Sequence, residues 1–287
     1  MWPSKTWRRA FPKFWGNSGS LRFFTPTRMF NKQRLATAML FSSTIGYLGL
    51  KKSWLSFGNN FECQGTQIEY SHENVTILDH SLIPFLLSKI RDPDCTPADF
   101  RRYSDRIMHL LIEEAIAAEP MKISRKKTLA GGEFDHYSLT KSAEDYCAVT
   151  IIRAGDSMLA KMFELIPGIK VGKILIQRDE NSKDKHPIFY YSKLPRGISS
   201  KKVFILDPML GTGGSCNLTI RKLKERGVKE ENITFVNLIS CPEGLAAVTD
   251  SHPGVKIITA VVDPCMNDNM YIEPGLGDFG DRFFNSD

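Results

Sequence analysis

Five short apolar runs in the second half of the chain constrain its fold more than any other feature. They are rich in Val and Ile and cover residues 147–152, 171–177, 202–207, 232–240 and 255–262. Stretches of helical character lie between them, at residues 157–166, 215–227 and 242–252. This alternation predicts an α/β fold with a central parallel sheet that helices cover on both faces. Ligands of such sheets bind beyond the carboxyl ends of the strands.

Three further segments complete the expected domain. Residues 96–120 predict a long helix, because Thr96 can cap it, Pro97 suits its first turn and apolar residues recur at helical spacing. Residues 72–92 have a shorter helical pattern that Pro84 interrupts. Residues 178–201 are charged and then aromatic, which is typical of a flap or a hairpin.

A carboxylate and a glycine-rich loop stand at the end of the run 202–207. The loop consists of Asp207, Pro208, Met209, Leu210, Gly211, Thr212, Gly213, Gly214 and Ser215. Glycines let backbone amides approach a ligand, and the helix that follows adds the positive end of its dipole. The loop is therefore predicted to hold a phosphate, and the Asp207 carboxylate suits the hydroxyls of an adjoining ribose. The alternative interpretation is an ordinary tight turn between a strand and a helix.

Two arginines follow two of the other runs. Arg153 comes directly after residues 147–152, where its charge and the amides around Gly155 suit a second anion. Arg178 comes after residues 171–177 and opens the charged segment, so that it can swing onto a leaving diphosphate. A structural or a solvated arginine is the alternative in each case, and the sequence leaves that choice open.

The C-terminal stretch contains a dinucleotide-binding pattern that its context excludes. Gly275, Gly277 and Gly280 match GxGxxG, but seven residues after Gly280 leave no room for a helix or a βαβ unit. We expect instead a compact turn whose backbone N–H and C=O groups face a flat heterocycle. No CxxC pair and no His/Cys cluster indicates a metal site.

The basic charge of the chain is concentrated in residues 1–60, which hold ten Lys or Arg and no acid. The remainder has 28 basic and 32 acidic residues, which argues against a nucleic-acid-binding core. The composition of residues 1–34 is typical of a transit peptide for a mitochondrion or a plastid. The uncharged run 35–50 also allows a membrane anchor, although about 24 Å of helix is short for a bilayer core. An unprocessed extension on a cytoplasmic protein remains the alternative.

Five motifs of the remainder resemble those of the uracil phosphoribosyltransferases. They are IIRAGDSM (151–158), GKILIQRDE (172–180), LDPMLGTGGS (206–215), NLISCPEGL (237–245) and YIEPGLGDFGDRFF (271–284). The resemblance extends over nearly everything from about residue 70 to 287 and is closer to the eukaryotic and protist branch of the family. It divides the chain into an extension, residues 1–60, and a phosphoribosyltransferase domain, residues 61–287.

The resemblance implies the type I phosphoribosyltransferase fold, with a flap or β-arm and a C-terminal hood over the base. The implied reaction joins uracil to 5-phosphoribosyl 1-diphosphate (PRPP) and gives UMP and diphosphate. Asp207 through Ser215 would bind the ribose and the 5-phosphate, and Arg153 and Arg178 would bind the diphosphate. The residues implied for the uracil site are Ile272, Gly277, Asp278 and Phe279. Asp278 would also face PRPP and is a candidate proton acceptor. Gly211 and Glu273 depart from the alanine and the apolar residue more usual in the family.

The resemblance also implies Mg²⁺ bound with PRPP and a homodimer. Many members are activated by GTP, which favours a tetramer. Arg106 is the residue of this chain that matches the GTP site of those members. Pro97 stands where relatives can have a lysine. The alternative from another functional class is a non-catalytic regulator that binds nucleotides through the same fold. Retention of Arg153, Arg178 and Asp278 favours the enzyme.

Overall fold

The computed structural model describes residues 70–179 and 186–286. The predicted targeting segment, including the possible anchor at residues 35–50, lies outside the described residues. In the part that is described, no helix combines the length and the apolar character needed to cross a bilayer.

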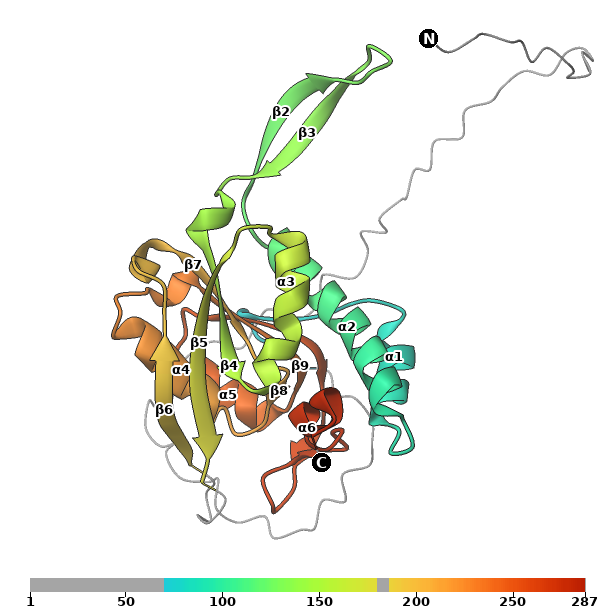
Figure 1. The fold of residues 1–287 in the computed structure, drawn as a ribbon, viewed down its shortest axis with the longest axis vertical. Coiled ribbons are helices and arrows are strands. Elements are labelled where there is room, and N and C mark those ends of the chain that lie inside the picture. Colours follow the sequence, from blue (N-terminus) through green and yellow to red (C-terminus); the bar gives the residue numbers. More distant parts are fainter. Residues whose placement is uncertain (1–69, 180–185, 287) are drawn as a thin grey trace, which may run out of the picture. The chain divides into compact units, whose positions relative to one another are not determined.

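One sheet of eight strands organises this part of the chain (Figure 1). Its strands are β1 (Val75–Ile77), β4 (Tyr146–Ile152), β5 (Lys170–Arg178), β6 (Pro187–Lys193), β7 (Lys202–Leu206), β8 (Met209–Leu210), β9 (Ile233–Ser240) and β10 (Lys256–Val262). The order is β1-β10-β9-β7-β4-β5-β6, with β8 beside β9. All neighbours are parallel except β5 and β6. The five apolar runs are thus confirmed as the parallel strands β4, β5, β7, β9 and β10.

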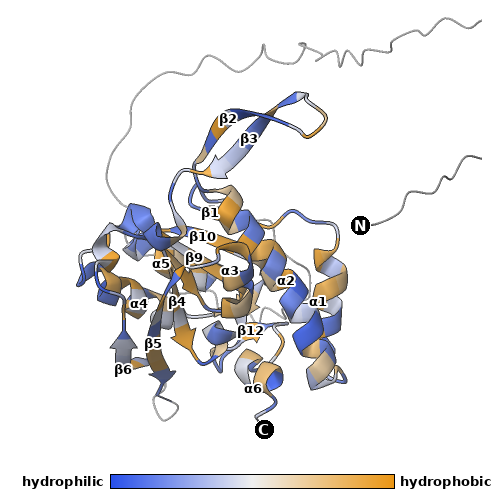
Figure 2. Ribbon diagram, turned by 45° about the horizontal axis from the view of Figure 1, so that its top comes forward, coloured by the Kyte–Doolittle hydropathy of each residue, from blue (hydrophilic) through white to orange (hydrophobic). Residues whose placement is uncertain are grey.

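Helices cover both faces of the sheet, as the continuous apolar runs predict. The helices are α1 (Ile83–Arg91), α2 (Pro97–Ala117), α3 (Leu159–Leu165), α4 (Gly214–Lys224), α5 (Pro242–Ser251) and α6 (Phe279–Phe284). Residues of α1, α2, α3 and α6 form one buried cluster with alternate strand residues such as Phe204 and Val236. Residues of α4 and α5 form a second cluster with the intervening ones, such as Ile205 and Phe235. Figure 2 shows the apolar strands β4, β9 and β10 lying among these helices.

The two helices between β1 and β4 that precede most of the sheet, α1 and α2, each have a proline in the first turn. The Thr96 hydroxyl accepts a hydrogen bond from Asp99 N at 3.2 Å, which confirms the predicted cap of α2. Pro84 lies in the first turn of α1, where its missing N–H costs nothing. The expectation that Pro84 breaks a helix is therefore wrong. Pro84 lies in the first turn of α1, and residues 75–77 before that helix form β1.

Two hairpins and a short terminal helix complete the fold. The predicted flap is confirmed as a hairpin, because β6 returns antiparallel beside β5 and joins the main sheet. A second hairpin, β2 (Met121–Lys127) with β3 (Glu133–Leu139), projects from the rest of the domain and was not predicted (Figure 1). The exclusion of a helix after the last glycines is wrong, because α6 forms there; Asp278 caps it by accepting from Asp281 N at 2.9 Å.

The remaining elements are short. Strands β11 (Cys265–Met266) and β12 (Ile272–Glu273) pair antiparallel beside the C-terminal segment. Single 3-10 turns occur at η1 (Ala143–Asp145), η2 (Ala154–Met158), η3 (Ile198–Ser200) and η4 (Glu230–Asn232).

Candidate active site

A cavity of about 990 Å³ opens at the carboxyl ends of the strands. Its walls come from the ends of β4 and β5, from the loop after β7, and from the C-terminal segment 267–280. The predicted residues that line it are Arg153, Arg178, Asp207, Met209, Gly211, Ser215, Ile272, Gly277, Asp278 and Phe279. Segments separated by more than a hundred residues thus meet at the sheet edge where the strand pattern places a ligand.

The predicted phosphate loop runs from Asp207 into the first turn of α4. Gly213 precedes this helix with φ of +75°, a conformation that favours glycine, and an added Cβ would lie 3.0 Å from Ala247 Cβ. The N–H of Gly214 donates to Thr212 Oγ1 at 3.3 Å. The loop therefore brings backbone amides and a helix N-terminus to one wall of the cavity, which suits an anion.

Other members of this loop hold it in place. The Pro208 carbonyl accepts hydrogen bonds from Leu238 N at 2.9 Å and Ile239 N at 3.0 Å. Leu210 belongs to β8 and pairs with Ser240. Pro208, Leu210, Thr212, Gly213 and Gly214 are not among the residues that line the cavity. These five residues shape the backbone that carries Asp207, Gly211 and Ser215.

Asp207 is half-buried at the start of the loop. Burial raises the pKa of its carboxyl to about 7, while the charge of Arg178 and a hydrogen bond from the Met209 backbone oppose the rise. Asp278 raises the pKa further by like-charge repulsion. A carboxyl with such a pKa in a cavity is poised to gain or lose its proton near neutrality, and ligand cations or hydroxyls would favour its charged form.

Arg153 connects the end of β4 to the C-terminal segment. Its Nη2 pairs with Asp281 Oδ1 and lies 4.0 Å from Asp278 Oδ1, and its Nη1 donates to Ser286 Oγ at 2.7 Å. The hydrogen bonds from Arg153 and Ser286 hold the pKa of Asp281 below its usual value. Arg153 thus already forms an ion pair with a carboxylate of α6, and this contact was not predicted from the sequence.

The ion pair of Asp156 with Lys173, close to Arg153 in the chain, was not predicted from the sequence either. Asp156, in η2, accepts from Lys173 Nζ on β5 at 2.7 Å and from Thr150 Oγ1 on β4 at 2.6 Å. It ties the turn that carries Arg153 to the two strands beneath it. Lys173 interrupts an apolar run and Asp156 follows a strand end, which are the signals by which they could have been found.

Two of the candidate base-binding residues have no side chain free to enter the cavity. Phe279 is 2% exposed, and its ring packs against Phe100 and Phe283 with centroid distances of 5.3 and 5.6 Å. Gly277 adopts φ of +83° and has no side chain. Ile272 lies in β12, next to exposed Glu273. This wall can offer N–H and C=O groups to the edge of a heterocycle, as the glycine pattern predicts.

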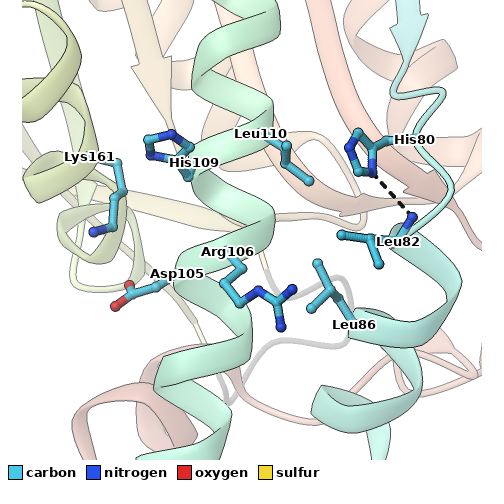
Figure 3. Close-up of a pocket in the computed structure, with 8 residues that line it drawn as sticks. All are labelled: His80, Leu82, Leu86, Asp105, Arg106, His109, Leu110 and Lys161. Atoms are coloured by element: carbon cyan, nitrogen blue, oxygen red, sulfur yellow. Dashed lines mark hydrogen bonds between the residues drawn. The ribbon is translucent and has the colours of Figure 1, made fainter. Parts of the chain in front are cut away.

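Arg106 lies apart from these residues, in a second cavity of about 370 Å³ between α1 and α2 (Figure 3). The cavity is lined by His80, Leu82, Leu86, Asp105, Arg106, His109, Leu110 and Lys161. Burial raises the pKa of the Asp105 carboxyl, and the nearby Lys161 opposes that rise.

Comparison with known proteins gives a consistent set of relatives. The family model for uracil phosphoribosyltransferase matches residues 77–286. A uracil phosphoribosyltransferase of Dictyostelium discoideum is 44% identical over 217 residues, covering 75% of this chain and 98% of that protein. One of Saccharomyces cerevisiae is 42% identical over 199 residues, covering 69% and 90%. The solved structure of the AQ2163 protein from Aquifex aeolicus is 33% identical with a TM-score of 0.64, covering 74% and 98%.

Proposed function

The chain belongs to the uracil phosphoribosyltransferase family, and we propose that the cavity at the strand ends is where it carries out the reaction of that family. The enzyme transfers the 5-phosphoribosyl group of PRPP to N1 of uracil and releases diphosphate, a pentosyl transfer of pyrimidine salvage. One observation carries the assignment of the site: a single cavity gathers the phosphate loop, both arginines and the C-terminal turn.

PRPP would lie along the phosphate loop. The amides of Gly211 and Ser215, the two residues of the stretch 211–215 that line the cavity, and the N-terminus of α4 suit the 5-phosphate. The Asp207 carboxylate can accept hydrogen bonds from the two ribose hydroxyls, and its neighbour Arg178 can face the diphosphate. The anomeric carbon would then point toward the C-terminal turn, where the base arrives.

The leaving diphosphate would be stabilised by Arg153 and Arg178. Both line the cavity, and negative charge grows on the diphosphate as the bond to the anomeric carbon breaks. Arg153 must exchange part of its contact with Asp281 for the ligand. Because Asp278 and Asp281 lie beside the same guanidinium, that exchange connects the diphosphate site to the base site.

Mg²⁺ would accompany PRPP. No group of three or more His, Cys, Asp or Glu in residues 70–179 and 186–286 is arranged to hold a metal. The oxygens of Asp207 and Asp278 in the cavity fit an ion that takes most of its ligands from the diphosphate and water. When bound, the ion supplies positive charge that neutralises the leaving group.

Uracil would be held by backbone groups of Ile272 and Gly277 to Phe279, and it must lose the proton on N1. Asp278 lines the cavity; its Oδ1 caps α6 and lies 4.0 Å from Arg153. Its other carboxylate oxygen is the candidate proton acceptor, directly or through water.

The test follows UMP formation by the full chain with Mg²⁺, PRPP and labelled uracil. Asp278→Asn keeps the size and the cap oxygen but removes the charge, so UMP formation is expected to be lost. Asp94→Asn, at an exposed loop position, is the matched control and should keep full activity. A folded wild-type protein that forms no UMP, but binds it tightly, would instead establish the non-catalytic regulator.

A second proposal concerns GTP, which would bind in the cavity that contains Arg106. Arg106, His109 and Lys161 provide positive or protonatable groups, and Leu82, Leu86 and Leu110 provide an apolar wall (Figure 3). GTP is expected to raise the rate of the wild type and of Arg102→Gln, an exposed position on the same helix, but not of Arg106→Gln. A wild-type rate that does not respond to GTP would refute the proposal.

A third proposal concerns assembly: the β2–β3 hairpin would pair two copies into a homodimer. Met121, Ile123, Phe134 and Tyr137 on this hairpin are between 40% and 60% exposed, although they are large and apolar. Ile123→Lys should therefore shift the mass measured by light scattering from dimer to monomer. A wild-type monomer would refute the proposal, and a tetramer in GTP would extend it.

The location in the cell is proposed from residues 1–60 alone. Their basic, acid-free composition favours delivery to a mitochondrion or a plastid, or anchoring through residues 35–50. A fluorescent reporter fused to residues 1–60 is expected to collect at an organelle. A diffuse cytoplasmic signal would refute targeting.

A further inference from the structure

A buried ion pair fastens the C-terminal segment to the last turn of α1. Arg91 ends α1, and Asp263 follows β10. The guanidinium donates to both carboxylate oxygens, with Nη2 2.6 Å from Oδ1 and Nη1 2.9 Å from Oδ2. The Asp263 side chain is 1% exposed and that of Arg91 20%. Neither residue lines the cavity at the strand ends.

The pair holds Gly275 through both of its backbone polar groups. The N–H of Gly275 donates to Asp263 Oδ2 at 3.0 Å, and its carbonyl accepts from Arg91 Nη1 at 3.1 Å. Gly275 has φ of +55°, and an added Cβ would lie 2.2 Å from the Ile272 carbonyl. The turn from Ile272 to Gly275 is thus closed tightly, and the two charged side chains determine where it lies.

A second arginine fastens the same turn to the same helix end. Arg282, on α6, donates from Nη1 to the carbonyls of Leu276 at 2.7 Å and Ile90 at 2.6 Å, and from Nη2 to that of Asp92 at 2.7 Å. Carbonyls at the end of a helix lack intrahelical partners, so a cation there is favoured. The segment that begins at Ile272 and ends in α6 is anchored to α1 at two successive residues, Gly275 and Leu276.

We propose that Arg91 and Asp263 are positioning residues for uracil. The inference rests on the proposed assignment of the base site to Ile272, Gly277, Asp278 and Phe279. Those residues flank Gly275 on both sides and offer backbone groups, whose positions no side-chain rotation can adjust. The ion pair sets these positions from outside the cavity. In the proposed site PRPP binds chiefly through the loop after β7, which the pair does not touch, so the effect on uracil should exceed the effect on PRPP.

The decisive variant is Arg91→Lys in the full chain. Lysine keeps the positive charge beside buried Asp263, but a single ammonium cannot reproduce the planar fork that spans both carboxylate oxygens and the Gly275 carbonyl. The KM for uracil is expected to rise about tenfold or more, while the KM for PRPP changes less than about twofold. The thermal unfolding midpoint should stay close to that of the wild type. Arg102→Lys, an exposed arginine on α2, is the matched control.

The outcomes separate this inference from the proposed function. No UMP from the wild type would remove the proposed function itself. If the wild type is active and Arg91→Lys has an unchanged KM for uracil, or an equal rise in both KM values, the positioning role is overturned. Should Arg91→Lys fail to fold, Asp263→Asn tests the same pair, because it removes the charge and one of the two oxygens that accept from Arg91, and an unchanged KM for uracil in that variant overturns the inference equally.

Discussion

Glu119 and Glu230, at the amino ends of the sheet, contrast with Asp207 at the carboxyl end of β7. At the amino ends, Lys202 pairs with Glu119 at 3.4 Å, and both side chains are at most 7% exposed. Burial opposes ionisation of Glu230, but hydrogen bonds from Lys224, His252 and Gly254 N bring its pKa down to about 2. At the carboxyl ends, burial raises the pKa of Asp207 to about 7 despite Arg178 nearby.

The difference separates carboxylates whose partners lie within the protein from a carboxyl that lies where a ligand would bind. The carboxylates at the amino ends are satisfied by lysine, histidine and backbone partners within the protein, which is expected of groups that serve stability. At the carboxyl ends, a perturbed carboxyl, arginines and backbone amides converge on a cavity, which is typical of a functional site. Changes at the two ends should therefore affect different measurements.

After the loss of UMP formation expected for Asp278→Asn, the next largest effect is expected at the carboxyl end, from Arg178→Gln. Removing the cation that is proposed to stabilise charge on the leaving diphosphate should lower kcat/KM about 10²–10³-fold. The unfolding midpoint should hardly change, because Arg178 lies at the end of its strand and faces the cavity. Arg226→Gln, at an exposed position after α4, is the control. Steady-state kinetics with varied PRPP would check it, and an unchanged kcat/KM would remove Arg178 from the site.

The corresponding change at the amino end is Glu119→Leu. It leaves Lys202 buried without its partner, which should cost about 3 kcal/mol of unfolding free energy. The kcat/KM of the folded protein should stay the same, since the pair is remote from the cavity. Urea denaturation measures the loss. The double variant Glu119→Leu with Lys202→Met should recover much of it; a double variant less stable than the single one would contradict this account.

A smaller effect is expected from pH, through Asp207. In the proposed site both of its oxygens accept from ribose hydroxyls, and protonation turns one of them into a donor, so kcat/KM for PRPP should rise up to about tenfold as the pH increases from 6 to 8. Asp207→Asn should flatten the profile at low activity. A wild-type profile without an inflection near neutrality would show that Asp207 is not the group that titrates.

The raised pKa of Asp207 also makes the stability of the folded protein depend on pH. Because the pKa of Asp207 is raised on folding, the folded state holds more protons than the unfolded state between about pH 4 and pH 7. Its contribution to stability is present at the acid end of that window and is lost as the pH rises through 7. PRPP, which favours the charged form, should offset that loss.

The smallest effect is expected from Gly211→Ala. An added methyl group would lie 3.6 Å from Met266 Sδ and 3.7 Å from Arg178 Nη2 and from Ile272 Cγ1, which are ordinary contacts. The space thus accepts the alanine that is more usual in the family, and kcat/KM should change by less than about twofold. Gly213→Ala is the contrasting variant, because φ of +75° and a 3.0 Å contact make it strained. Equal kinetics for the two variants would contradict this reading of the loop.

Elements with a long periodic pattern, and motifs at strand ends, could be recognised in the sequence. Short elements without such a pattern could not. The apolar runs became β4, β5, β7, β9 and β10 because strands buried on both faces must be apolar throughout. The hairpin of β2 and β3 was missed because its residues are mostly exposed and lack an apolar run. The last helix, α6, was wrongly excluded: its six residues are held by packing of Phe279 and Phe283 on α2 rather than by length.

By itself the sequence determined the parallel sheet and the family, and it predicted a phosphate loop after Asp207, because these depend on patterns local in the chain. Only the tertiary structure decided which charges meet. Arg153 with Asp281, Asp156 with Lys173, and Arg91 with Asp263 join residues that are 128, 17 and 172 positions apart. The physical reason is that an ion pair depends on the distance between two side chains in space, and a single sequence does not specify that distance until the strands have been ordered and the helices packed.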